Sequence, residues 1–152
     1  MARARASVEV PGPISAAEGL WYDTRRWPTW VDGFGHVAKL EGDWPRTGST
    51  LIWDSRPGGR GRVVEQVTRY EPRDGQDLRV EDERLRGTQS VRFAAAGDAV
   101  EITLAIEYEL KPGVLLKALV DLFFVRRAVA DSLRRTLARF ARELAAEREL
   151  LR

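Results

Sequence analysis

The sequence predicts an α+β protein in which one antiparallel sheet is followed by a long C-terminal helix. Two observations predict the sheet. Apolar and polar residues alternate through Ala99–Leu110, which is the period of a strand with one buried face, and several strand-like runs separated by turn residues precede it. The third observation is that the period becomes helical after Gly113 and stays helical to about Leu150.

The N-terminal residues predict one strand and then a short helical region. Ala4–Val10 carries a small or apolar residue at every second position, and the Pro-Gly-Pro sequence behind it ends this strand. Ser15 and Glu18 have the spacing of a capping box, so we expect a helix to open there. Pro28 should stop or kink the helical region.

Six further strands are predicted from the middle of the chain. The connections between them are short and contain Gly or Pro, the residues that turns require. Consecutive strands with short connections form an antiparallel meander. The predicted strands are His36–Leu40, Ser49–Ser55, Arg62–Tyr70, Asp77–Leu85, Thr88–Ala95 and Ala99–Leu110.

The C-terminal helix is predicted to be long and amphipathic. A single helix of roughly 35 residues would extend about 50 Å and could cross the whole sheet. Its first turns are apolar almost all round. Either the two short helices cover the part that the sheet does not, or an apolar patch is left for a ligand entrance, a membrane or a second subunit. The apolar stripe consists of Leu116, Val120, Phe123, Ala130, Leu133, Leu137, Phe140 and Leu144.

Composition excludes several kinds of site. The 152 residues are typical of a single domain, residues 1–152. The absence of cysteine excludes disulfides and thiolate metal sites, and a single histidine excludes a histidine metal cluster, so we expect no metal and no cofactor. The 25 basic and 23 acidic residues are interleaved, which gives no case for nucleic acid. Without a signal sequence or a transmembrane segment, we expect a soluble, cytoplasmic protein.

Three stretches of the chain carry a family resemblance: VEVPGPISAAEGLWYDTRRWPTWVDG, GRVVEQVTRYEP and SLRRTLARFARELAAE. Together with the element order, they resemble the helix-grip fold of the START-like, or SRPBCC, superfamily, and within it the polyketide cyclase/dehydrase and lipid-transport group. The resemblance implies a seven-stranded antiparallel sheet curled around the long helix. It also implies two short helices after the first strand and a cavity between sheet and helix.

The Trp-Pro-Thr-Trp sequence has a direct interpretation in such a fold. Pro28 would break the second short helix where the chain turns into the sheet, and Trp27 would be a packing residue. Trp30 and Phe34 could belong to the cavity wall or to the core, and the core is slightly favoured.

The catalytic candidates are Asp82, Glu65, Tyr70 and Arg92. Asp82 shares a strand face with apolar residues, so it is expected to point inward, either as a general acid or in an ion pair with Arg84 or Arg92. The two faces of the strand around Glu65 are similar in polarity, so its orientation stays open.

Three functions are compatible with these residues. The first is binding or transport of a hydrophobic lipid, isoprenoid or polyketide; the second is a polyketide cyclase or dehydratase using the same cavity; the third is a protein- or membrane-interaction module. A peripheral membrane contact and a homodimer are compatible with the apolar start of the helix. The predicted ligand-binding residues are Trp30, Phe34, Leu51, Trp53, Val64, Gln66, Thr68, Leu78, Val80, Asp82, Val91, Phe93, Ile102, Leu104, Ile106, Leu116, Val120 and Phe123, with Gln89 as a further polar candidate.

Overall fold

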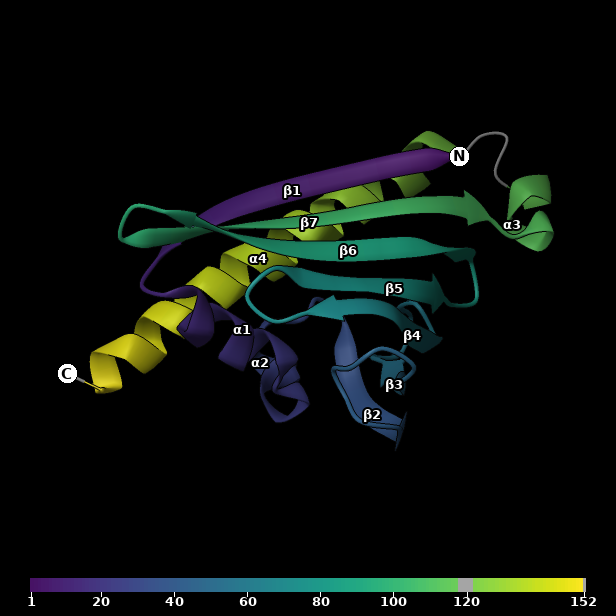
Figure 1. Cartoon of the computed structure of the whole chain (residues 1–152). Coiled ribbons are helices and arrows are strands. Elements are labelled where there is room, and N and C mark those ends of the chain that lie inside the picture. The colour runs from purple at the N-terminus through teal and green to yellow at the C-terminus, as the bar shows by residue number, and fades with distance from the viewer. Residues whose placement is uncertain (118–121, 152) are drawn as a thin grey trace.

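A computed structural model describes residues 1–117 and 122–151 of the chain. It confirms the α+β class, with one seven-stranded antiparallel sheet and a long helix across one of its faces (Figure 1). The strands are β1 (Ala2–Pro11), β2 (Phe34–Glu41), β3 (Thr50–Ser55), β4 (Arg62–Glu71), β5 (Gly75–Glu81), β6 (Leu85–Ala96) and β7 (Ala99–Leu110). The helices are α1 (Ile14–Tyr22), the 3₁₀ turn η1 (Thr24–Arg26), α2 (Trp27–Trp30), α3 (Pro112–Lys117) and α4 (Leu122–Leu150).

The sheet has the strand order β1-β7-β6-β5-β4-β3-β2. Strands β2 to β7 follow one another as neighbours, and β1 pairs with β7 over its whole length. The alternation predicted for β7 is confirmed, because Ile102 and Leu104 are buried and Glu101 is exposed. Figure 1 shows β2 and β3 turned away from the plane of β6 and β7, so that the sheet curls around the side that α4 covers.

The prediction of one C-terminal helix of roughly 35 residues is wrong. The helical segments α3 and α4 lie on either side of residues 118–121, and α3 is off the axis of α4 (Figure 1). With 29 residues, α4 is about 43 Å long, close to the roughly 40 Å of a twelve-residue strand. The buried apolar residues described on α4 are Leu133, Leu137, Phe140 and Leu144, with Thr136 buried beside them.

The predicted capping box does not form. Helix α1 begins at Ile14 after Pro13, and no side chain caps it. Ser15 lies inside the helix, and the Glu18 carboxylate instead accepts a hydrogen bond of 2.8 Å from the backbone N–H of Arg73. The local spacing predicted the helix but not its first residue, because Glu18 binds the β4–β5 turn and does not cap the helix.

Pro28 begins a helix where the sequence predicted an end. It lies in the first turn of α2, where its missing N–H has no intrahelical acceptor to lose. The four-residue helix therefore places Trp27 and Trp30 one turn apart. Trp27 is buried and donates its indole N–H to the Trp21 carbonyl at 2.8 Å, which confirms it as a packing residue.

The aromatic residues of α1 and α2 fill the space between the sheet and the C-terminal half of α4. The ring centroids of Trp21 and Trp30 are 4.7 Å apart, and those of Trp30 and Phe140 are 5.0 Å apart. Arg26 of η1 adds an ion pair of 2.6 Å to Glu143 of α4. None of the described helices combines the length and apolar content needed to cross a bilayer.

Candidate functional site

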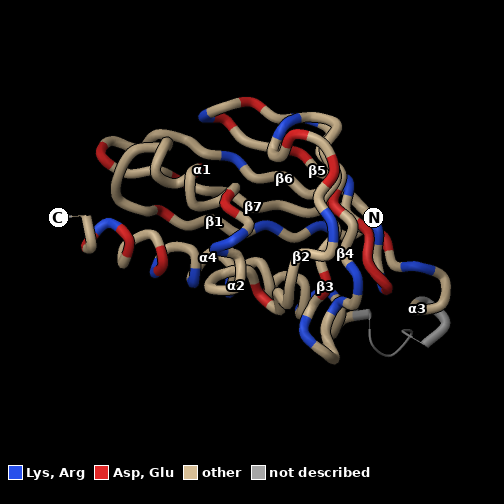
Figure 2. The backbone as a smooth tube through the Cα atoms, turned by 90° about the horizontal axis from the view of Figure 1, so that it is seen from below, with Lys and Arg blue, Asp and Glu red and all other residues tan. Residues whose placement is uncertain are grey.

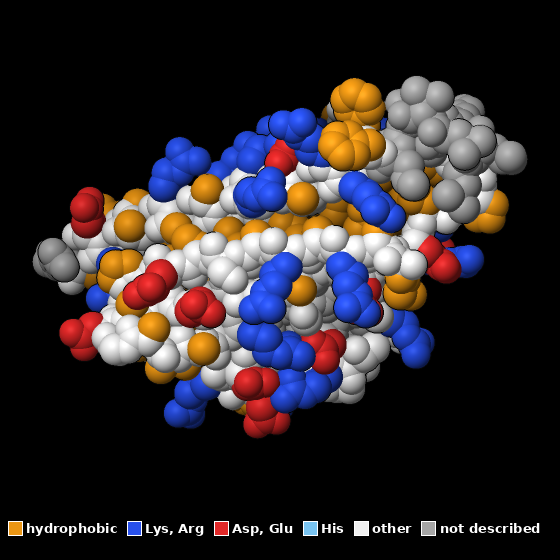
Figure 3. All heavy atoms as spheres, turned by 90° about the horizontal axis from the view of Figure 1, so that it is seen from above, with side chains coloured by type: hydrophobic (Ala, Val, Ile, Leu, Met, Phe, Trp, Pro, Cys, Tyr) orange, Lys and Arg blue, Asp and Glu red, His pale blue; other side chains and the backbone are white. Residues whose placement is uncertain are grey.

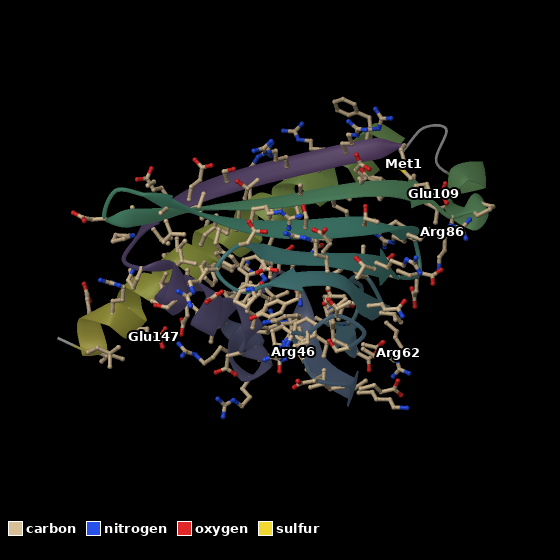
Figure 4. The ribbon with its side chains drawn as sticks, in the orientation of Figure 1. Met1, Arg46, Arg62, Arg86, Glu109 and Glu147 are labelled. Atoms are coloured by element: carbon tan, nitrogen blue, oxygen red, sulfur yellow. The ribbon has the colours of Figure 1, made fainter. Side chains whose placement is uncertain are left out.

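The two ends of the inner sheet face differ in what covers them. Helices α1 and α2 and the C-terminal half of α4 cover one end, which we call the closed end and which Glu147 marks (Figure 4). At the other end lie α3 and the start of α4, and we call it the open end. The ion pair between Arg86 and Glu109, 2.8 Å long, marks the open end.

A cleft of about 760 Å³ lies at the open end, between the sheet, the connections at its edge and α4. Most of the side chains that line it are apolar, and the polar ones come from several different elements. The apolar lining residues are Leu85, Ile106, Val114, Phe124, Val125, Ala128, Val129 and Leu133. The polar lining residues are Asp32, Arg60, Asp82, Arg84, Gln89, Ser132 and Arg135.

A second, much smaller cavity of about 60 Å³ lies in the interior beside the cleft. We call it the inner cavity. Its lining includes Trp30, Trp53, Glu65, Leu78 and Leu104. Five residues line both spaces and so separate them: Asp32, Arg60, Gln89, Ser132 and Leu133.

Asp82 points inward, as predicted, and pairs with a different arginine from the two expected. One carboxylate oxygen accepts a hydrogen bond of 2.7 Å from the Arg60 guanidinium. The other accepts from the backbone N–H groups of Arg84 and Leu85, at 2.8 and 2.9 Å. Three donors therefore hold Asp82 as an acceptor that shapes the β5–β6 turn, which does not suit a general acid.

Arg60 stands between the cleft and the inner cavity. Its guanidinium carbon is 5.6 Å from the centroid of the Trp53 ring, within the range of a cation–π contact. Together with the ion pair to Asp82, this contact fixes the β3–β4 connection against the inner face. The sequence analysis missed Arg60, because only the folded hairpin brings it to the β5–β6 turn.

Asp32 ties the turn after α2 to α4. Its carboxylate accepts hydrogen bonds from Ser132 at 2.8 Å and from Arg135 at 3.1 Å, while its backbone N–H donates to Thr136 at 3.1 Å. Partial burial raises the pKa of Asp32, but the hydrogen bonds from Arg135 and Ser132 and the charge of Arg139 outweigh it and hold the pKa below its ordinary value. The tie fixes one wall of the cleft.

Glu65 points inward, which settles the orientation that the sequence left open. It is buried on β4 between Val63 and Val67. Burial raises the pKa of Glu65 to about 7, against the opposing charge of Arg60 and the nearby Trp53 indole. The Trp53 N–H nevertheless makes no hydrogen bond of normal geometry among the described residues.

Because Glu65 faces inward, its neighbours Val64, Gln66 and Thr68 lie on the outer face of β4, away from the cleft and the inner cavity. Their predicted place in the ligand pocket is therefore corrected. Both faces of this strand carry valine and polar residues, so alternation alone could not choose between them.

Tyr70 and Arg92 are also away from the cleft. Tyr70 follows a β-bulge and packs against Tyr22 of α1, with ring centroids 5.5 Å apart, at the closed end. Arg92 lies on the outer face and donates to Asp77 at 2.6 Å. Neither side chain lies beside Glu65 or Asp82, so the four catalytic candidates do not form one site.

The other predicted ligand-binding residues divide by position. Ile106 and Asp82 line the cleft, and Trp30, Trp53, Leu78 and Leu104 line the inner cavity. Val120 and the side chain of Leu116 lie outside the described residues. The remaining inward residues belong to the packed core and line neither space within the described chain: Phe34, Leu51, Val80, Val91, Phe93 and Ile102.

Phe123 was predicted to line the pocket and is instead 73% exposed. Its neighbour Phe124 is 68% exposed and contributes to the cleft. The seven-residue spacing from Leu137 placed Phe123 on the apolar stripe, but the structure leaves its side chain exposed in the first turn of α4. Figure 3 shows a narrow line of hydrophobic side chains along the molecule, with Lys and Arg side chains on both sides of it. Figure 2 shows that acidic residues alternate with basic ones along the strands and along α4.

One signal in the sequence could have found the helical wall of the cleft. Val125, Ala128, Val129 and Ser132 follow one another at spacings of three, one and three residues, which is one face of a helix. This face lies beside the core stripe and consists of small residues. Small side chains on a covering helix leave space between helix and sheet.

Comparisons with known proteins agree with this architecture. A protein-family model described as "Polyketide cyclase / dehydrase and lipid transport" matches residues 1–145. No curated protein matches the sequence. A conserved protein from Geobacillus kaustophilus is similar in structure, with a TM-score of 0.74, 14% sequence identity and 95% of each chain covered.

Two further solved structures share the fold. DynU16, from the dynemicin biosynthetic locus, has a TM-score of 0.70 and 20% identity over 95% of this chain and 48% of its own. Norcoclaurine synthase of Thalictrum flavum, in complex with a transition-state analogue, has a TM-score of 0.63 and 14% identity over 96% of this chain and 95% of its own. At these identities the structures establish the fold alone. With a family model that matches almost the whole sequence and a sheet that grips its C-terminal helix, this chain belongs to the polyketide cyclase/dehydrase and lipid-transport family of helix-grip proteins.

Proposed function

We propose that this protein binds or transports an elongated hydrophobic small molecule, of the lipid, isoprenoid or polyketide class, in the cleft. The observation that carries the proposal is the cleft itself. Its volume of about 760 Å³ falls within the roughly 300–1,000 Å³ of small-molecule sites, and its lining is apolar with a few polar groups. Family membership supports the same class of ligand.

The polar groups of the cleft are suited to orienting a ligand. The ion pair between Arg60 and Asp82 and the network around Asp32 hold their side chains in fixed positions. Polar groups that are already fixed lose little conformational entropy when a ligand arrives. The apolar wall of α4 supplies the surface that a ligand buries, and the fixed polar groups determine the orientation of the ligand.

A pair of tryptophan substitutions on α4 tests the proposal. Ala128 lines the cleft, and Ala145 is exposed on the same helix 17 residues later, about 25 Å away. We expect Ala128→Trp to fill part of the cleft and weaken binding of the neutral dye N-phenyl-1-naphthylamine at least tenfold, as measured by dye fluorescence. Ala145→Trp should leave binding unchanged. Equal binding by both variants and the unmodified protein would place the dye elsewhere.

A cyclase or dehydratase is the second candidate function, and Glu65 is the observation that favours it. Because burial raises its pKa to about 7, a neutral carboxyl is present in the inner cavity near neutral pH and could donate a proton to a carbonyl oxygen. Norcoclaurine synthase, which has this fold, is an enzyme. A poly-β-ketone thioester incubated with the protein and with Glu65→Gln tests this function. An enzyme should lose at least about a hundredfold in turnover in the variant while dye binding persists.

A further inference from the structure

The inner cavity collects buried polar atoms that the described protein does not satisfy. Among the described residues, Trp30 Nε1, Trp53 Nε1 and Glu65 Oε2 are buried without a hydrogen-bond partner, and all three residues line this cavity. Trp30 and Trp53 are each 1% exposed and Glu65 is 4% exposed. Buried polar groups in folded proteins are nearly always paired, so three unpaired atoms around one space indicate a binding position.

The position of the cavity makes it reachable from the cleft. Arg60, Gln89 and Leu133 line both spaces, so only side chains separate them. The cavity volume of about 60 Å³ exceeds the roughly 10–15 Å³ that one water molecule needs. A hydroxymethyl group fits such a volume. The end of a thin chain that lies in the cleft could therefore enter.

The three atoms select the chemistry of that end. Both indole N–H groups are donors only, so they require an acceptor. The carboxylate form of Glu65 requires a donor. A hydroxyl group accepts from an indole and donates to the carboxylate at the same time. An ammonium group offers no acceptor and is repelled by Arg60, whereas a ligand carboxylate is repelled by the ionised Glu65.

We propose that the inner cavity recognises the terminal hydroxyl group of an apolar ligand whose chain lies in the cleft. The proposal deepens the binding function above and rests on it. Trp30 and Trp53 donate hydrogen bonds to the hydroxyl oxygen, and the Glu65 carboxylate accepts a hydrogen bond from the hydroxyl group. Glu65 is a ligand-binding residue in this arrangement, and no bond is made or broken.

Matched aliphatic probes test the proposal. 1-Dodecanol, dodecyl methyl ether and 2-dodecanone share a long alkyl chain, but only the alcohol both donates and accepts. Their affinities can be measured by displacement of N-phenyl-1-naphthylamine. We expect the alcohol to bind about tenfold more tightly than the ether, the difference that one well-placed hydrogen bond to a charged group supplies. The ketone should bind no better than the ether.

Variants then locate the preference. Glu65→Met replaces the carboxyl with an apolar group of similar length, and Trp53→Phe removes one N–H donor; each should reduce the alcohol-to-ether ratio to about one. Gln66→Met, at the next position on the outer face, is the matched control and should keep the ratio. If Trp53→Phe does not fold, Glu65→Met still decides the question, since it removes an unpaired buried carboxyl.

Each other outcome contradicts the proposal in a distinct way. If alcohol and ether bind equally and Ala128→Trp weakens both, the cleft binds ligands and the cavity holds only water. If the ketone binds most tightly, Glu65 acts as a proton donor to a carbonyl. If none of the probes binds, the cleft function and the hydroxyl site both fail.

Discussion

The closed end and the open end of the inner face use the same sheet for different purposes. At the closed end, Trp21, Trp30 and Phe140 pack with centroid separations of 4.7–5.2 Å and fill the space beneath α4. At the open end, small residues of α4 face the sheet across a cleft of about 760 Å³. Polar ties through Asp32 and Asp82 hold the walls of the cleft without filling it.

This difference between the two ends suggests that one half of α4 mainly stabilises the fold and the other half mainly binds ligand. Large aromatic side chains bury much area and are the main source of packing energy. Ion pairs and hydrogen bonds contribute less net stability, but they fix positions. We therefore expect substitutions at the closed end to change the free energy of unfolding, and those at the open end to change ligand binding.

The largest expected change in the free energy of unfolding is at the closed end. Phe140→Ala removes a fully buried ring that contacts two tryptophans, so the free energy of unfolding should fall by about 3–5 kcal/mol. Urea denaturation followed by tryptophan fluorescence measures it. A loss below about 1 kcal/mol would mean that the aromatic cluster is not the main source of stability.

Glu65 lines the inner cavity, and its contribution to the free energy of unfolding should depend on pH. Its pKa is raised from 4.5 to about 7, so the folded protein binds this proton more tightly than the unfolded chain does. The protein should therefore be most stable, as far as Glu65 is concerned, below pH 4.5, and lose about 3 kcal/mol as the pH rises through about 7.

Glu65→Gln should lack this dependence. The difference in the free energy of unfolding between the two proteins, measured in urea at several pH values, isolates Glu65 from the other titrating groups. A difference that does not change with pH would mean that Glu65 titrates normally in the folded state.

Asp82→Asn tests the polar tie at the open end. The substitution removes the charge that pairs with Arg60 and weakens the acceptor for two backbone N–H groups. Since Arg60 is partly exposed, we expect a loss of about 2 kcal/mol. Asp131→Asn, in an exposed pair with Arg134, is the control and should change stability by less than about 0.5 kcal/mol. Equal effects would mean that burial of Asp82 adds nothing.

The smallest change in stability is expected for Phe124→Ala. Phe124 is 68% exposed, so the free energy of unfolding should stay within about 0.5 kcal/mol. Phe124 also lines the cleft, and dye binding should weaken severalfold. A strongly destabilised variant with unchanged dye binding would reverse the roles of the two ends.

Most of the fold could be predicted from the sequence, because most strands show in their own residues which face is buried. The alternation in β7 and the turn residues between the strands are local signals, and local hydrogen bonding follows from them. Errors arose where a distant contact overruled a local signal. Glu18 had the spacing of a capping residue and instead binds the β4–β5 turn.

The site was less predictable for the same physical reason. The cleft is assembled from Asp32, Arg60, Asp82 and Val129, which lie far apart in the chain and meet only when the sheet curls over α4. The predicted strand Asp77–Leu85 is wrong at its end, because residues 82–84 form the turn between β5 and β6. Its alternation still predicted the inward direction of Asp82, but the arginine that pairs with Asp82 comes from another hairpin. On β4, where Val63 and Val64 point to opposite faces, only the curvature of the sheet decides which face is inside.

The buried carboxyl of Glu65 affects how variants of this protein would fare under selection. An unpaired buried carboxyl destabilises the fold, so a library selected for heat resistance alone should accumulate apolar residues at position 65. Selection for ligand retention should restore glutamate there. If the preferred residue at position 65 differs between the two selections, ligand binding and stability make opposite demands on that position.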